Sequence, residues 1–160
     1  ANHGQCRRYY HDVVGCNSRL DTIQAAVLGI KLRYLDAYID ARRAVADYYD
    51  AAFDGHPKIT TPYRAPYSRH VFHQYTLVVE GVDRDALHAY LAQHNVPSMI
   101  YYPVPAHRQK MFSHFGSEET ELPATDWLTG KVISLPMHTE LDEEQLAFIT
   151  SNVLAFVNNN

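Results

Sequence analysis

Asn17 and Arg19 are the first side chains in this sequence whose types and spacing indicate a ligand. A long helix is predicted to begin beside them, with Asn17 or Ser18 as its N-cap and Asp21 completing a pattern close to a capping box. Unpaired N–H groups at a helix start favour an anion, and the Asn17 amide and Arg19 guanidinium would add donors. The pattern therefore predicts a phosphate or carboxylate site, although it is also typical of a capped helix with a solvated arginine.

A second candidate site follows an apolar run over residues 96–102. Tyr101 and Tyr102 end that run, and two prolines stiffen the segment between them and His107. Two phenols and an imidazole in a stiff loop can bind a ligand through hydrogen bonds and ring contacts. The alternative interpretation is an aromatic pair at the edge of the core with a histidine on the surface.

Other kinds of site find little support. His70 and His73 are three residues apart at the entrance of a predicted strand, where such positions face opposite sides, and no HExxH or CxxC pattern is present. We therefore expect no metal site. Cys16 lies at the predicted helix start, but no histidine or carboxylate has a spacing that identifies it as the base of a nucleophilic cysteine.

The element that must position the first site is an amphipathic helix expected over residues 18–53. Apolar residues recur there at three- to four-residue steps, no proline interrupts them, and Gly55 stops the pattern. At ~1.5 Å per residue such a helix is about 50 Å long, so one end is expected to pack on something other than this chain's own core. Gly29 is where a bend is expected, and residues 1–17 are expected to form a loop.

The second site belongs to a region that the pattern predicts as a small α+β domain, behind a proline-rich connector over residues 55–70. Asp142 with Gln145 forms a capping-box pattern for the last helix. Strands are expected over residues 71–79, 96–102 and 132–135, and helices over residues 84–95, 124–130 and from 143 onwards. The expected fold is a small, mainly antiparallel three-stranded sheet with helices on one face, preceded by the long helix.

Composition narrows the class of protein. A 46% apolar and 20% charged content is typical of globular chains, and the net charge of −4 argues against nucleic-acid binding through general electrostatics. No apolar run of ~18 residues predicts a membrane span. Two cysteines do not make a disulfide framework, which favours a cytoplasmic protein. Because the sequence starts without an initiator methionine, we interpret it as a fragment, or as a processed or incompletely represented protein.

The stretch GCNSRLDTIQAAVL, residues 15–28, resembles the segment that follows the active-site lysine region in DegT-type sugar aminotransferases. Three other motifs fit the same family in the same order, so the resemblance spans essentially the whole chain. They are His3-Gly4-Gln5, Tyr101-Tyr102-Pro103-Val104-Pro105 and Ser134-Leu135-Pro136-Met137-His138. Within the family, the sequence is most similar to enzymes that aminate UDP-linked 3-keto sugars of the 3-oxo-glucuronate type.

The resemblance implies a dimeric enzyme of the aspartate-aminotransferase fold, fold-type I. Residues 1–54 would be the end of its large domain, a loop and the interdomain helix, and residues 55–160 its C-terminal small domain. The full-length enzyme would use pyridoxal 5′-phosphate (PLP) to transfer an amino group, from glutamate, to a nucleotide-linked keto sugar. The implied setting is the cytoplasm, in the biosynthesis of surface polysaccharides such as lipopolysaccharide.

The resemblance also assigns roles to particular residues in a homodimer whose sites are shared across the interface. Asn17 would reach the PLP phosphate of the neighbouring subunit. The residues that would bind the nucleotide-sugar substrate are Arg8, Tyr10, Arg19, Tyr101, Tyr102 and His107.

By the same resemblance, this chain lacks the lysine that forms the Schiff base with PLP. None of its lysines stands in the family's lysine motif; they are Lys31, Lys58, Lys110 and Lys131. We therefore expect no catalytic residue in this chain, no tightly bound PLP and no transamination by the chain alone. The alternative is a non-catalytic α+β binding module that dimerises through the long helix.

Overall fold

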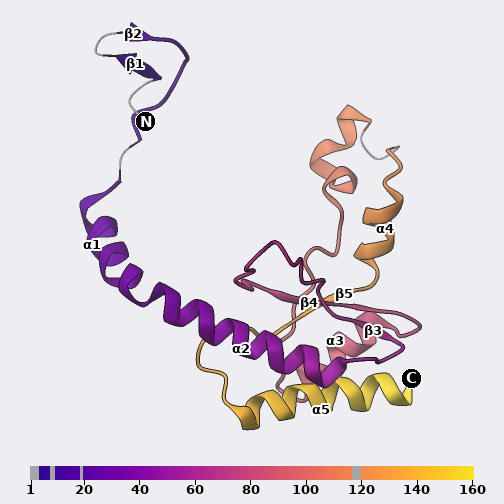
Figure 1. Ribbon diagram of the computed structural model, residues 1–160. Helices are drawn as coiled ribbons and strands as arrows, with labels where there is room; N and C mark the ends of the chain where they lie inside the picture. The colour runs from indigo at the N-terminus through magenta and orange to yellow at the C-terminus, as the bar shows by residue number, and fades with distance from the viewer. Residues whose placement is uncertain (1–3, 8–9, 19, 117–119) are drawn as a thin grey trace. The chain divides into compact units, whose positions relative to one another are not determined.

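The computed structural model describes residues 4–7, 10–18, 20–116 and 120–160 (Figure 1). Its chain divides into two compact units, Ala1–Tyr38 and Ile39–Asn160. The assignment of residues 1–54 to a large domain and a connecting helix, and of residues 55–160 to a small domain, stays a prediction. No helix among the described residues combines the length and the apolar character that crossing a membrane requires.

The first unit begins with a short hairpin rather than the expected loop. Strands β1 (Gln5–Arg7) and β2 (Tyr10–His11) pair antiparallel, and the Arg7 guanidinium lies 3.8 Å from the centre of the Tyr10 ring. Strands of two and three residues are too short to show an alternating pattern. The sequence therefore offered no signal for this hairpin.

The predicted N-cap of the long helix was wrong. Helix α1 (Thr22–Lys31) is capped by Asp21, whose carboxylate accepts hydrogen bonds from the backbone N–H groups of Ile23 and Gln24 at 2.9 and 3.1 Å. Asn17 and Ser18 precede this cap and lie outside the helix. Aspartate satisfies the unpaired N–H groups as well as serine or asparagine does, so sequence preference alone could not decide between the three.

The predicted helix over residues 18–53 is also interrupted, although not at Gly29. Helix α1 is followed by a single 3₁₀ turn, η1 (Leu32–Tyr34), and then by α2 (Leu35–Phe53). Gly29 lies inside α1, and the backbone stays right-handed at Leu32 and Leu35, so the helical course continues through a tighter turn.

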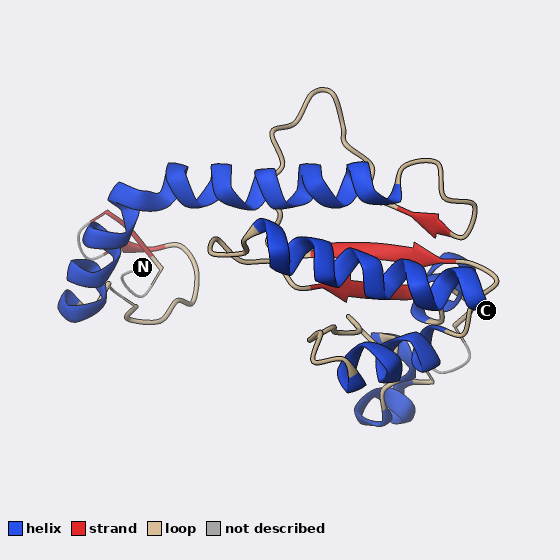
Figure 2. Cartoon of the chain, turned by 90° about the horizontal axis from the view of Figure 1, so that it is seen from below, coloured by secondary structure: helices blue, strands red, loops and turns tan. Residues whose placement is uncertain are grey.

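The second unit contains the core and a three-stranded antiparallel sheet in the order β3 (Ile59–Thr60), β4 (Tyr75–Val79), β5 (Val132–Leu135). Three helices lie on one face of it, namely the part of α2 from Ile39 onwards, α3 (Arg84–Gln93) and α5 (Glu143–Asn159) (Figure 1). Figure 2 shows α5 running along the sheet. The expected α+β architecture, with a small antiparallel sheet and helices on one face, is confirmed.

Fully buried side chains from these elements form one core. They are Ala46, Tyr49, Tyr75, Leu77, Leu87, Leu91, Ile133, Val153 and Val157. Their spacing follows the helix period in α2, α3 and α5 and strict alternation in β4, where Tyr75, Leu77 and Val79 point inward. The apolar periodicity in the sequence therefore reports the packing in this unit.

Two of the three predicted strands differ from the structure. The strand over residues 71–79 begins only at Tyr75, because Phe72 has a positive φ and the carbonyls of Phe72 and His73 accept hydrogen bonds from Arg42 instead of a neighbouring strand. The prediction of a strand over residues 96–102 was wrong, because only Met99 pairs there, with Ser134. Prolines at 97 and 103 lack the N–H groups that a longer ladder needs. The third strand is β3, inside the predicted connector.

The helix ends in this unit were predicted well. Asp83 caps α3, α4 covers Pro123–Thr129, and the capping box of Asp142 and Gln145 opens α5.

We expect Asp142→Ala to lower the free energy of unfolding by about 1 kcal/mol, because the Asp142 carboxylate accepts a hydrogen bond from the Gln145 N–H at 2.8 Å. Urea denaturation measures this. Glu143→Ala, one residue later and outside the box, should cost clearly less, and an equal loss would contradict the capping role.

Candidate functional site

An open cavity of about 500 Å³ in the second unit, here called the tyrosine cavity, combines aromatic, apolar and a few polar side chains. One wall comes from the segment after the Met99 bridge, the other from α4, and Val132 at the start of β5 completes it. The lining residues are Tyr101, Tyr102, Val104, Pro105, Ala106, Gln109, Met111, Thr125, Leu128, Thr129 and Val132. No charged side chain is among them, so the cavity suits an uncharged ring with a few hydrogen-bonding edges.

A second cavity of about 300 Å³ shares Tyr101 with the first. Its lining includes Ser134, Pro136 and His138, together with His73 and Gln74. The backbones of Met99 and Ser134 exchange two hydrogen bonds, at 3.0 and 2.7 Å, and this bridge brings the two motifs together. Two of the segments that resemble sugar aminotransferases, about 30 residues apart, therefore meet around Tyr101.

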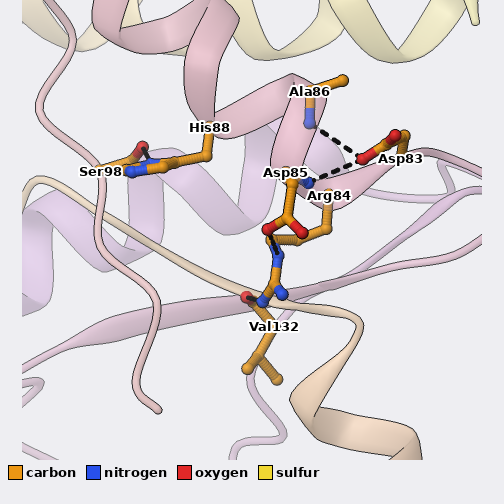
Figure 3. Close-up of polar contacts among 7 residues, drawn as sticks. All are labelled: Asp83, Arg84, Asp85, Ala86, His88, Ser98 and Val132. Carbon is orange, nitrogen blue, oxygen red and sulfur yellow. Dashed lines mark hydrogen bonds and ion pairs between the residues drawn. The ribbon is translucent and has the colours of Figure 1, made fainter. Parts of the chain in front are cut away.

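Two side chains of helix α3 contact segments that lead into this region (Figure 3). Arg84 is buried at 7% exposure and donates from Nη1 to the Val132 carbonyl at 2.9 Å, with its Nε bonded to Asp85. His88 Nδ1 lies 2.8 Å from the hydroxyl of Ser98, in the segment that leads to Tyr101. The two contacts tie α3 to the start of β5 and to the segment that precedes the loop wall of the tyrosine cavity.

The two walls of the tyrosine cavity are joined by charged side chains that do not line it. Arg108 Nη2 lies 2.7 Å from Asp126 Oδ2 on α4, and Arg108 Nε donates to His107 Nε2 at 3.3 Å. The His107 side chain is only 11% exposed and its Nε2 is 3.8 Å from Asp126 Oδ1. Arginine, histidine and aspartate thus form one cluster beside the cavity.

The structure places the predicted substrate-binding residues in different positions. Tyr101 and Tyr102 line the tyrosine cavity, whereas His107 contacts the Arg108–Asp126 pair outside it. Tyr10 is an exposed residue of β2 in the first unit. Arg8 and Arg19 lie outside the described residues.

Asn17 is exposed, four residues before the N-cap of α1. The two N–H groups of Ile23 and Gln24 already bind the carboxylate of Asp21, so the helix start carries an anion of its own. The electrostatic argument for an anion site at this helix start is therefore weaker than the sequence indicated. A role for Asn17 rests on the family resemblance.

The four lysines lie outside the lining of the candidate site. Lys58 Nζ donates to the Val157 carbonyl, and Lys131 Nζ lies 3.4 Å from Glu80 and 4.5 Å from the centre of the Trp127 ring. Lys31 is in the last turn of α1 and Lys110 in the 3₁₀ helix η3 (Lys110–Phe115). None of the four lines either cavity around Tyr101. Among the described residues, no group of three or more His, Cys, Asp or Glu side chains could hold a metal ion.

Sequence reasoning missed the α4 wall of the site. Thr125, Leu128 and Thr129 line the cavity and Asp126 pairs with Arg108, yet the helix was predicted only as a connection to the last strand. The lone signal was a proline at the first position of the helix, which marks where a helix starts and not what it faces.

Known proteins resemble this chain in both sequence and fold. Residues 1–154 match the DegT/DnrJ/EryC1/StrS aminotransferase family. The chain is 43% identical over 150 residues to the UDP-N-acetyl-3-dehydro-α-D-glucosamine 3-aminotransferase of Acidithiobacillus ferrooxidans, covering 94% of this chain and 39% of that protein. It is 38% identical over 149 residues to the UDP-2-acetamido-2-deoxy-3-oxo-D-glucuronate aminotransferase of Pseudomonas aeruginosa, covering 93% of this chain and 40% of that protein.

Among solved structures, DesV of S. venezuelae superposes with a TM-score of 0.85 at 33% identity, covering 98% of this chain and 42% of that one. An aminotransferase from Brucella abortus superposes with a TM-score of 0.81 at 34% identity, covering 97% of this chain and 40% of that one. The chain therefore spans about two fifths of the length of the proteins it matches. Sequence and structure agree that the chain belongs to the DegT/DnrJ/EryC1/StrS aminotransferase family.

Proposed function

We propose that this chain is the C-terminal part of a PLP-dependent aminotransferase that acts on a nucleotide-linked keto sugar. The observation that carries the proposal is the tyrosine cavity, because two family-like motifs meet at Tyr101 and the cavity has an uncharged lining of hydroxyl, amide and apolar groups. Such a lining suits an uncharged ring of a sugar nucleotide and not its diphosphate. The relatives named above act on UDP-linked 3-keto sugars, which supports a substrate of that class.

The residues of this chain do not fit covalent attachment of PLP, because none of the four lysines lies at the candidate site. We propose that a lysine in a preceding part of the protein forms the Schiff base, that PLP is not tightly bound by this chain, and that the chain alone does not transaminate. Asn17 would contact the PLP phosphate of the neighbouring subunit in a homodimer with shared sites. The DesV structure named above was solved in complex with a ketimine intermediate, which supports PLP as the cofactor.

Within this proposal, Tyr101 and Tyr102 hold the substrate ring through their hydroxyls and ring faces. His107 as a further substrate-binding residue stays a prediction, and so do Arg8, Tyr10 and Arg19. Glutamate as amino donor, a cytoplasmic location and a place in surface polysaccharide biosynthesis are likewise proposed from the resemblance. These proposals concern the full-length protein and not this chain alone.

Reduction with borohydride tests the missing lysine directly. After incubation of this chain with PLP, reduction and peptide mapping should find no lysine labelled stoichiometrically. The full-length protein treated in the same way should carry the label on one lysine upstream of the present residue 1. Stoichiometric labelling of Lys31, Lys58, Lys110 or Lys131 would overturn the assignment, and a full-length protein without any labelled lysine would overturn the aminotransferase proposal.

A second candidate function is a dimerising module without catalysis. It is favoured by the exposed apolar side chains along α1, among them Ile23, Val27 and Ile30. Light scattering separates the two candidates. A stable, folded dimer without PLP supports the module, whereas an aggregating chain supports an enzyme part whose apolar helix has lost its cover.

A further inference from the structure

We propose that Arg108 and Asp126 are positioning residues that hold the two walls of the tyrosine cavity at a set spacing. The proposal rests on the proposed function, because it takes this cavity as the place where the substrate binds. It concerns two side chains that neither line the cavity nor belong to the motifs that resemble sugar aminotransferases.

Each member of the ion pair is next in sequence to a residue that lines the cavity. Arg108 is the last residue of the 3₁₀ turn η2 (Ala106–Arg108), directly before Gln109, and Asp126 directly follows Thr125 on α4. Both Gln109 and Thr125 line the cavity. A contact of 2.7 Å between Arg108 Nη2 and Asp126 Oδ2 therefore sets the distance between one wall and the other.

The guanidinium of Arg108 is held in one orientation by its second contact. Its Nε donates to His107 Nε2 at 3.3 Å while its Nη2 reaches Asp126. His107 is nearly buried and its Nε2 faces the other carboxylate oxygen of Asp126 at 3.8 Å. The charge of Arg108 is already matched by Asp126, so Arg108 is not an unpaired cation available to bind a diphosphate. The pair therefore acts on the shape of the cavity.

The expected effect is on binding more than on folding. The side chains of Arg108 and Asp126 are 51% and 32% exposed, and an ion pair at such a site contributes little to stability. A change in wall spacing acts instead on every contact that the substrate makes with both walls. Loss of about 1 kcal/mol of substrate binding corresponds to a KM raised about fivefold with kcat little changed.

Kinetics of the full-length enzyme test the proposal. Asp126→Asn should raise KM for the nucleotide sugar about fivefold and leave kcat within about twofold. The matched control is Asp40→Asn, which breaks the exposed pair between Asp40 on α2 and Arg69 and should leave KM unchanged. The charge-swapped double variant, Arg108→Asp with Asp126→Arg, should restore KM toward the wild-type value. An unchanged KM in Asp126→Asn, or no restoration in the double variant, overturns the proposal.

A second measurement uses the full-length protein and needs no activity. Trp127, the single tryptophan of these 160 residues, follows Asp126 on α4, so the part of the acrylamide quenching that is lost in a Trp127→Phe variant reports how α4 is held. Asp126→Asn should increase the quenching constant, the double variant should reverse the increase, and Asp40→Asn should leave it unchanged. Unchanged quenching in Asp126→Asn overturns the positioning role. If the full-length protein proves not to be an aminotransferase, the proposed function fails while this readout still decides the inference.

Discussion

Replacing Asp50 with alanine is expected to lower the free energy of unfolding by about 3 kcal/mol. Asp50 on α2 accepts a hydrogen bond from the hydroxyl of Tyr75 at 2.5 Å, and its second oxygen lies 2.6 Å from Arg64 Nη2. Tyr75 is fully buried in the core, so the variant leaves its hydroxyl without a partner. An unsatisfied buried group costs about 1–3 kcal/mol, and hydrogen bonds to charged groups lie at the upper end.

Asp47→Ala is the matched control, because Asp47 is on the same helix and pairs with the same arginine at 2.8 Å. Its side chain is 66% exposed against 30% for Asp50, so its loss should cost less than about 1 kcal/mol. Urea denaturation at pH 7 measures both variants. Tyr75→Phe should cost less in the Asp50→Ala background than in the wild type. Equal losses for Asp47→Ala and Asp50→Ala would contradict the role of Asp50 as the partner of the buried Tyr75 hydroxyl.

The Asp50–Arg64 contact acts as an ion pair and not as an aligned hydrogen bond. Arg64 Nη2 is close to the carboxylate, yet neither it nor Nε has an aligned acceptor among the described residues. The Arg64 guanidinium also lies 4.6 Å from the centre of the Phe72 ring. The arginine therefore anchors the segment before β4 to α2 through charge and ring contacts together.

Alkaline pH is expected to unfold the second unit steeply, because two tyrosines are buried in its core. Burial raises the pKa of Tyr49 well above the ordinary value of about 10, and burial with the hydrogen bond to Asp50 raises the pKa of Tyr75 further. Both groups stay protonated in the folded state while the unfolded chain releases its protons above pH ~10. Their contribution is thus complete below pH ~10 and is lost as the pH rises from there toward the folded pKa values.

Each tyrosine should contribute a slope of about 1.4 kcal/mol per pH unit above pH ~10, so that the pair contributes about 2.7. Stability measured by urea denaturation between pH 8 and 12 should be level at first and then fall with that slope. Tyr75→Phe should halve the slope, whereas Tyr63→Phe, at a residue that is 84% exposed, should leave it unchanged. A slope that Tyr75→Phe does not alter would contradict the assignment.

The same tyrosines connect the core to the candidate site. The Tyr49 hydroxyl donates to the Pro136 carbonyl at 2.9 Å, and its ring lies 4.9 Å from that of Tyr75. Pro136 lines the second cavity beside Tyr101. Loss of this network is therefore expected to alter the packing of the Ser134–His138 segment as well as that of α2.

Sequence alone determined the features that depend on near neighbours in the chain. Asp83 and the pair of Asp142 and Gln145 identified helix starts, and Val132–Leu135 was read as a strand, because caps and short apolar runs act over a few residues. The motifs around Asn17, Tyr101 and Ser134 also sufficed to indicate the family, which the comparisons confirmed.

Tertiary structure decided the features that depend on partners far along the chain. β3 is a strand because Ile59 and Thr60 pair with Val79 and Val78, and residues 96–102 are not, because only Met99 finds a partner in Ser134. The α4 wall of the tyrosine cavity and its ion pair to Arg108 join residues 18 positions apart. Sequence periodicity carries information over one or two turns or strands, whereas pairing and cavity walls depend on how distant segments pack, and only the folded chain specifies that.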